Sequence, residues 1–105
     1  MKTENLLLDI NGNLKITDFG FADSVAGDDN LSNFLYDCGT KGYKAPEISE
    51  GLPYFGHVVD LFASAVILFN LVTGKAPFIG EADRNKKSSY KHLLNLRPDL
   101  FWKKQ

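Results

Sequence analysis

The stretch from His57 to Thr73 predicts one helix that is apolar on nearly every face. In its central part, Leu61 to Val72, only Ser64 and Asn70 are polar. This apolar run is shorter than the roughly 20 residues that a membrane-spanning helix needs. A helix that is hydrophobic all round belongs in the interior of a protein. The sequence therefore predicts a buried helix that other elements must surround.

Composition is that of an ordinary globular domain. The chain has 105 residues, of which 44% are hydrophobic and 24% charged, as expected for one small domain. A formal net charge of -1 leaves no basic excess, which argues against nucleic acid or an anionic membrane as partner. Cys38 is the only cysteine and the N-terminus lacks the layout of a signal peptide, so we expect an intracellular protein, cytoplasmic or nuclear.

Two short apolar runs near the N-terminus predict a β-hairpin. Leu6 to Leu8 form the first strand and Leu14 to Thr17 the second. Asn11-Gly12 between them supplies the positive φ angles that a tight hairpin turn needs. Such a hairpin presents Asn5 at one end and Asp18 at the other, so two oxygen-bearing side chains approach the same edge.

The rest of the chain predicts a long loop followed by helices. Residues 21–44 show no sustained hydrophobic period, which indicates a functional loop. A short helix is expected after Pro46, and Gly74 is placed to end the long apolar helix. Residues 85–95 form a weaker amphipathic pattern, and residues 97–102 predict a closing turn with aromatic anchors. This order of elements predicts an α+β fold.

Several motifs follow one another at a characteristic spacing. They are Lys2-Thr3-Glu4-Asn5, Asp18-Phe19-Gly20, the G-T-x-x-Y-x-A-P-E run that begins at Gly39 and ends at Glu47, and the segment that begins at Asp60 in the apolar helix. Together they resemble the catalytic loop, D-F-G triplet, end of the activation segment and central helix of serine/threonine protein kinases. The likeness is nearest to the calcium/calmodulin-dependent and AMP-activated groups.

The resemblance implies an α+β, kinase-like C-lobe fragment in which helices surround one buried apolar helix. It divides residues 1–105 into a catalytic-loop remnant (1–5), a hairpin (5–17), an activation segment (18–47), the buried helix (about 57–73) and a further helix (about 85–95). The D-x-W-S-x-G pattern of the central helix is altered here, since Phe62, Ala63 and Ala65 replace its Trp, Ser and Gly.

Phosphoryl transfer depends on metal ions and positive charge placed around the phosphates. The amide oxygen of Asn5 and the carboxylate of Asp18 are hard ligands of the kind that Mg²⁺ prefers. Lys2 is a point charge suited to the γ-phosphate as it moves. The resemblance implies ATP and Mg²⁺ as cofactors of the intact family member, with weak or no binding by this chain, and a protein serine or threonine hydroxyl as the acceptor.

The resemblance assigns further roles. Leu7 matches the floor residue beneath adenine, Thr17 lines the nucleotide pocket, and Glu4 matches a position that contacts the ribose. Thr40 resembles the threonine that bonds to the catalytic Asp and Lys. Asp60 matches the aspartate that hydrogen-bonds the catalytic-loop backbone.

Other residues are expected to have structural or regulatory roles. Phe19, Gly20 and Glu47 occupy structural positions of the two kinase motifs in which they lie. Hydroxyl side chains in the loop are candidate phosphorylation sites, namely Ser24, Ser32 and Tyr36.

On the kinase pattern, the catalytic aspartate falls immediately before Met1. The Gly-rich loop and the strand lysine also have no counterpart in these 105 residues. We therefore expect a fragment that is inactive or nearly so by itself, because loss of the catalytic base alone costs about 10²- to 10⁴-fold in rate. We also expect association through exposed apolar surface. The alternatives are a non-catalytic kinase-like binding or regulatory module and a truncated gene model.

Overall fold

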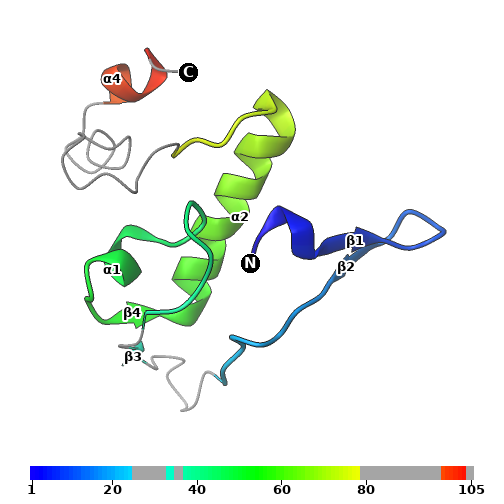
Figure 1. Ribbon diagram of the computed structural model, residues 1–105, viewed down its shortest axis with the longest axis horizontal. Coiled ribbons are helices and arrows are strands. Elements are labelled where there is room, and N and C mark those ends of the chain that lie inside the picture. Colours follow the sequence, from blue (N-terminus) through cyan, green and yellow to red (C-terminus); the bar gives the residue numbers. More distant parts are fainter. Residues whose placement is uncertain (25–32, 35–36, 79–97, 104–105) are drawn as a thin grey trace.

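The computed structural model describes residues 1–24, 33–34, 37–78 and 98–103 (Figure 1). In chain order the elements are η1 (Thr3–Asn5), β1 (Leu6–Leu8), β2 (Leu14–Ile16), β3 (Asn33–Phe34), α1 (Pro46–Ser49), β4 (Tyr54–Phe55), α2 (Gly56–Thr73) and α4 (Pro98–Trp102). The α+β class predicted from the sequence is confirmed. The helix predicted at 85–95 lies outside the described residues.

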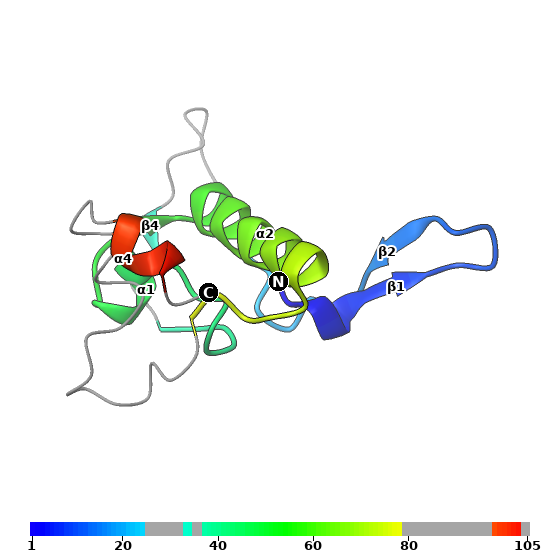
Figure 2. The same ribbon diagram turned by 90° about the horizontal axis from the view of Figure 1, so that it is seen from above.

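The predicted N-terminal hairpin is present. Strand β1 pairs antiparallel with β2, with Leu6 opposite Ile16 and Leu8 opposite Leu14. Figures 1 and 2 show the hairpin projecting away from α2. Apart from the half-buried Leu6, the apolar side chains of both strands are consequently exposed.

The turn of this hairpin differs from the predicted Asn-Gly turn. Gly12 has a φ of 80°, but Asn11 does not adopt a positive φ. The loop is instead organised by Asp9, whose carboxylate accepts hydrogen bonds from the backbone N–H of Asn11 at 2.9 Å and of Asn13 at 2.8 Å. The Asn13 side-chain amide donates a third at 3.0 Å. A carboxylate that bonds the backbone two residues ahead forms an Asx-turn, and the loop turns here without a positive φ at Asn11.

These bonds predict acid sensitivity of the hairpin. The Asn13 side chain, followed by its backbone N–H, holds the pKa of Asp9 below its ordinary value of 3.8. A folded-state pKa below the unfolded one means that ionised Asp9 stabilises the hairpin. That stabilisation is complete above pH 3.8 and is lost as the pH falls through the lowered pKa.

NMR chemical shifts of the loop amides between pH 6 and pH 2 test this prediction. We expect the hairpin pattern to fade at the acid end, and Asp9→Asn to abolish that transition. Lys15→Gln is the control, because Lys15 lies 3.9 Å from the Asp9 carboxylate on the surface and exposed ion pairs contribute little. Loop shifts that stay constant down to pH 2 would contradict the assignment.

Helix α2 begins and ends close to the predicted bounds. Gly74 caps it in the left-handed region with a φ of 69°, and its N–H donates to the Asn70 carbonyl at 2.8 Å. Glycine adopts this conformation without the steric cost that a Cβ brings. With 18 residues, α2 is the one helix in the described part of the chain that is long and apolar enough to cross a membrane by length and composition, a test that the core helix of a soluble protein also passes.

The core lies along one face of α2 and consists of two clusters. Val66 and Phe78 form the first, with Tyr43 packed against it. The second contains Ala45, Ile48 and Tyr54 from the segment around α1. Phe62 packs against both clusters and stacks on Phe78 with ring centroids 5.8 Å apart. The described core therefore joins α2 to the segment that precedes it.

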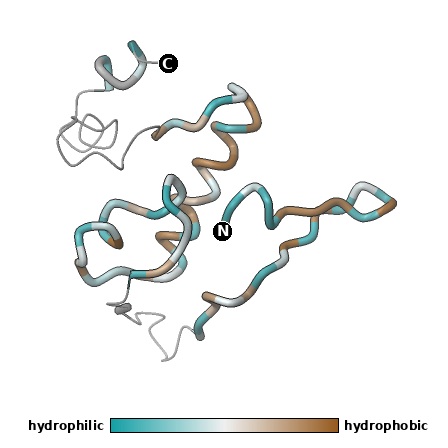
Figure 3. Tube along the Cα trace, in the orientation of Figure 1, coloured by the Kyte–Doolittle hydropathy of each residue, from teal (hydrophilic) through white to brown (hydrophobic). Residues whose placement is uncertain are grey.

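The prediction that α2 is buried all round is wrong. Of its residues only Ala63, Val66 and Ile67 are buried, and apolar positions such as Leu61 are exposed. Figure 3 shows the hydrophobic stretches of this helix. The described residues supply packing partners on one face only, so the opposite face meets solvent. Asp60, expected inside the protein, is exposed for the same reason.

The C-terminal segment is helical where a turn was predicted. Helix α4 starts at Pro98, a residue whose fixed φ suits the first helical turn. The Trp102 ring lies 6.1 Å from that of Phe69, centroid to centroid. Trp102 thus contacts α2 while remaining largely exposed.

Candidate functional site

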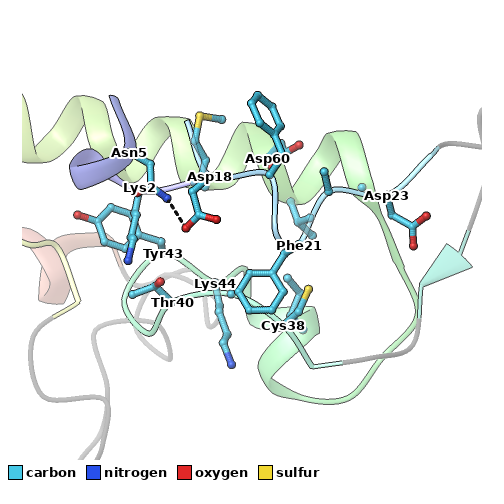
Figure 4. Close-up of a pocket in the computed structure, with 18 of the residues that line it drawn as sticks. Lys2, Asn5, Asp18, Phe21, Asp23, Cys38, Thr40, Tyr43, Lys44 and Asp60 are labelled. Atoms are coloured by element: carbon cyan, nitrogen blue, oxygen red, sulfur yellow. Dashed lines mark hydrogen bonds between the residues drawn. The ribbon is translucent and has the colours of Figure 1, made fainter. Parts of the chain in front are cut away.

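A pocket of about 490 Å³ opens where the N-terminal turn, residues 16–23, residues 38–44 and the first half of α2 meet. Figure 4 shows Asn5, Asp18 and Thr40 among the side chains that line it. These segments are far apart in the sequence. The pocket is thus a product of the tertiary fold.

Asn5 and Asp18 lie side by side in this pocket, as the hairpin predicts. The Asn5 side-chain amide donates a hydrogen bond from Nδ2 to Asp18 Oδ2 at 3.3 Å (Figure 4). The second carboxylate oxygen of Asp18 accepts the N–H of Gly20 at 3.3 Å. Thr17 joins the ends of the hairpin, because its N–H donates to the Asn5 carbonyl at 2.9 Å and its hydroxyl to the same oxygen at 3.2 Å.

The backbone of Asp18 is strained. Its φ of 64° makes it the one residue other than glycine with a positive φ in the described ranges. Aspartate tolerates this region better than most residues, and strained conformations cluster at functional sites. The Asn5 bond and the Gly20 N–H hold the carboxylate in the pocket in this conformation.

Lys2 and Thr40 also line the pocket. Lys2 is half-buried and Thr40 is exposed. Between these two side chains the structure shows no hydrogen bond. The pocket thus combines a cation, a hydroxyl, a carboxylate and an amide in one cavity.

Comparison with known proteins shows the family of this sequence. Residues 1–103 match the protein kinase domain family. This chain belongs to the protein kinase family. It is 42% identical over 100 residues to developmentally-regulated protein kinase 1 of Dictyostelium discoideum, an alignment that covers 95% of this chain and 12% of that protein.

Named serine/threonine kinases are similarly related. The chain is 45% identical over 80 residues to serine/threonine-protein kinase SIK2 of Gallus gallus (76% of this chain, 10% of the relative). It is 44% identical over 96 residues to CBL-interacting serine/threonine-protein kinase 19 of Arabidopsis thaliana (89% and 19%). The chain is thus a serine/threonine kinase sequence that spans between 10% and 19% of the length of these relatives.

Kinases of this family use ATP and Mg²⁺, and the donor set in the pocket fits Mg²⁺. No group of three or more His, Cys, Asp or Glu residues capable of holding a metal occurs among the described residues. Mg²⁺ does not need one, because it keeps several waters and takes only one or two protein carboxylates with the phosphates. Asp18 supplies a carboxylate, and Asn5 an amide oxygen that is not used in its bond to Asp18.

Some predicted site residues do not line the pocket. Glu4 is exposed on the N-terminal turn, and Leu7 is exposed on β1. Their predicted contacts with ribose and adenine stay predictions. Asp60 lines the pocket, but its carboxylate forms no hydrogen bond to residues 1–5 in the structure, and its backbone carbonyl accepts the Ser64 hydroxyl at 2.9 Å.

The structure describes only some of the residues that were predicted to have structural or regulatory roles. Phe19 lines the pocket and is largely exposed, while Glu47 is half-buried in α1. The N–H of Ser24 bonds the Asp23 carboxylate at 2.8 Å. Ser32 and Tyr36, the other candidate phosphorylation sites, lie outside the described residues.

Sequence reasoning missed a hydrogen-bonded bridge beneath the pocket. The Tyr43 hydroxyl lies 2.9 Å from the Thr3 hydroxyl and accepts the Asn70 side-chain amide at 3.3 Å. Tyr43 thereby joins the N-terminal turn, the A-P-E segment and α2. Asn70 Oδ1 is buried without a partner in the described part of the chain. The tyrosine of the G-T-x-x-Y run is the only sequence signal for this bridge.

Removing a hydroxyl from the bridge is expected to destabilise the chain. Thr3→Val keeps the shape of the side chain but loses the bond to Tyr43, so the free energy of unfolding should fall by about 1 kcal/mol. Thr3→Ser retains the hydroxyl and serves as the control. Urea denaturation of these variants, with Tyr43→Phe and the Thr3→Val/Tyr43→Phe pair, measures the coupling. Additive effects of the two substitutions would show that the hydroxyls do not interact.

Proposed function

We propose that this chain is a C-lobe segment of a serine/threonine kinase related to the calcium/calmodulin-dependent and AMP-activated groups. The parent enzyme transfers the γ-phosphate of ATP to serine or threonine hydroxyls of proteins. The observation that carries this proposal is the Asn5–Asp18 pair at 3.3 Å in a pocket that Lys2 and Thr40 also line. Membership of the serine/threonine kinase family supports it.

Four polar side chains of the pocket have a role in this proposal. Asn5 and Asp18 would hold Mg²⁺, which would neutralise charge on the phosphates. The Asn5 amide orients the Asp18 carboxylate through their hydrogen bond. Lys2 places an ammonium charge near the transferring phosphoryl group, and the Thr40 hydroxyl positions the catalytic loop.

We also expect the 105-residue chain to be inactive by itself. No residue in it matches the catalytic aspartate, the Gly-rich loop or the strand lysine. Electrostatic positioning of the phosphates is the main source of kinase catalysis, and those parts supply most of it. Transfer of labelled phosphate from ATP to a serine-containing peptide should therefore be undetectable, and measurable transfer would contradict this statement.

Binding of Mn²⁺ with ADP tests the metal site directly. Paramagnetic Mn²⁺ broadens NMR signals of nearby amides, and we expect broadening at Asn5 and Asp18 at millimolar Mn²⁺. The hairpin loop provides a matched internal control, because Asp9 and Asn13 form an equivalent carboxylate–amide pair at 3.0 Å outside the pocket. Equal broadening at both pairs, or none at Asp18, would reject the proposed site.

A further inference from the structure

An ion pair closes the loop that carries Thr40 at the edge of the pocket. Lys44 Nζ lies 2.5 Å from Asp37 Oδ1 and donates a hydrogen bond to it, which makes this a charge-assisted bond. Between the two residues the chain turns, because the N–H of Tyr43 donates to the Thr40 carbonyl at 3.1 Å. The loop of residues 37–44 thus returns on itself and brings its two charged ends together.

The two partners of this ion pair differ in exposure. The Lys44 side chain is 21% exposed and that of Asp37 is 67% exposed. A Cβ placed on Gly39 would meet Lys44 Cγ at 3.5 Å, so the stem of Lys44 packs directly over that glycine. Long cationic side chains cover protein surface with their stems while the charged head stays accessible. Packing therefore fixes the position of the Lys44 ammonium, whereas Asp37 is the more exposed partner.

Lys44 belongs to the wall of the pocket but not to the proposed metal site. It lines the pocket together with Thr40 and Asp18, and Figure 4 shows its side chain directed away from Asp18. A substrate protein is larger than a cavity of about 490 Å³, so the residues that flank the acceptor hydroxyl must pass over the pocket wall. Neighbouring residues of an extended chain are about 3.3 to 3.6 Å apart. A residue next to the acceptor can therefore reach the loop that carries Lys44.

We propose that Lys44 selects an acidic residue of the protein substrate next to the acceptor hydroxyl, and that Asp37 occupies this position when no substrate is bound. The inference rests on the proposed function, because it requires the acceptor to enter the pocket. The bond between Lys44 and Asp37 supports it, since it shows that a carboxylate fits against the Lys44 ammonium. A glutamate or aspartate of the substrate replaces Asp37, whose side chain then turns to solvent.

The charge of the loop favours an acidic residue over a basic one. Residues 37–44 contain two lysines, Lys41 and Lys44, and one aspartate, which leaves a net positive charge. Lys41 is exposed on the same turn and forms no salt bridge within the part of the chain that the structure describes. A basic side chain of the substrate could approach Asp37 only close to the like charge of Lys44, which opposes it.

A purely structural role of the ion pair is the alternative. If the pair only closed the loop, removal of either partner would loosen residues 37–44 and change peptide binding in the same direction. In the proposed arrangement the two partners have opposite effects, because Lys44 binds the substrate and Asp37 competes with it. Substitutions that remove one charge at a time therefore separate the two roles.

Peptide binding to the 105-residue chain with Mg²⁺ and ADP, followed by NMR shifts of the loop amides, tests the proposal. The probes are capped peptides in which glutamate, glutamine or lysine follows a single serine. We expect the glutamate peptide to bind roughly threefold tighter than the glutamine peptide, with a preference that shrinks as salt is added. Asp37→Asn should tighten glutamate-peptide binding by about two- to fivefold. Lys44→Met keeps the stem over Gly39 and should abolish the preference.

The hairpin provides a matched ion pair as the control. Lys15 Nζ lies 3.9 Å from Asp9 Oδ2 outside the pocket, so Lys15→Met and Asp9→Asn should leave the peptide preference unchanged. Changes of the same sign in Asp37→Asn and Lys44→Met would overturn the proposal. So would a preference for the lysine peptide, or the absence of any preference among the three peptides.

The metal site is measured separately, without peptide. Mn²⁺ broadening at Asn5 and Asp18 reports on the proposed function and does not depend on Lys44. A chain that binds the metal in the pocket but shows no preference for glutamate rejects the acidic-residue site alone. A chain that does neither rejects the proposed function as well.

Discussion

Replacing Asp18 by Asn is expected to weaken Mn²⁺ binding in the pocket by roughly 10- to 100-fold. Loss of groups that only orient a metal ligand already costs that much, and this substitution removes an anionic ligand itself. Asparagine tolerates the positive φ of 64° at this position, so the backbone should keep its path. Titration of Mn²⁺ with ADP, followed by NMR line broadening at Asn5, measures the change.

Asp9→Asn is the control for this experiment. It removes a carboxylate that also bonds an asparagine side chain, but Asp9 does not line the pocket. Mn²⁺ affinity should therefore be unchanged in that variant. If both substitutions weaken binding equally, general negative charge and not the pocket attracts the metal, and the proposed function loses its main support.

Replacing Phe78 by Ala should have the largest effect on stability. Phe78 is 8% exposed, forms the first core cluster with Val66, and stacks on Phe62. Phenylalanine-to-alanine changes in a core cost about 3 to 5 kcal/mol, while whole domains are stable by only about 5 to 15 kcal/mol. We expect the urea unfolding transition, followed by far-UV circular dichroism, to shift to much lower urea or to lose its cooperativity.

Phe19→Ala is the matched control, since Phe19 is 69% exposed and surface substitutions usually change stability by less than about 0.5 kcal/mol. Equal urea midpoints for the two variants would show that the Phe62–Phe78 stack does not form the core of this chain in solution. The comparison of the two variants also tests whether packing on the buried face of α2 is the main source of stability.

Local chemistry made several features predictable from the sequence. The hairpin follows from two apolar runs, and the pairing of its strands necessarily brings Asn5 close to Asp18. The end of α2 at Gly74 follows from the ease with which glycine adopts a positive φ. Kinase membership was predictable because the motifs are short, ordered and rich in chemically specific residues.

Other features depend on residues that are distant in the sequence. Thr3 and Tyr43 are hydrogen-bonded although 40 residues separate them, and no local pattern indicates that pair. The turn at Asp9 was mispredicted because the Asn-Gly signal describes backbone preference, whereas the carboxylate offered the loop three hydrogen bonds.

The apolar helix from His57 to Thr73 illustrates the difference between what local sequence predicts and what tertiary packing adds. From the sequence one can predict that this segment is helical, where the helix ends and that its surface is mostly apolar. These properties depend on residues that are neighbours in the sequence. Only the tertiary structure decided which face is covered, since burial depends on packing partners. Those partners lie along the face that carries Val66, and residues such as Leu61 and Leu68 are left exposed.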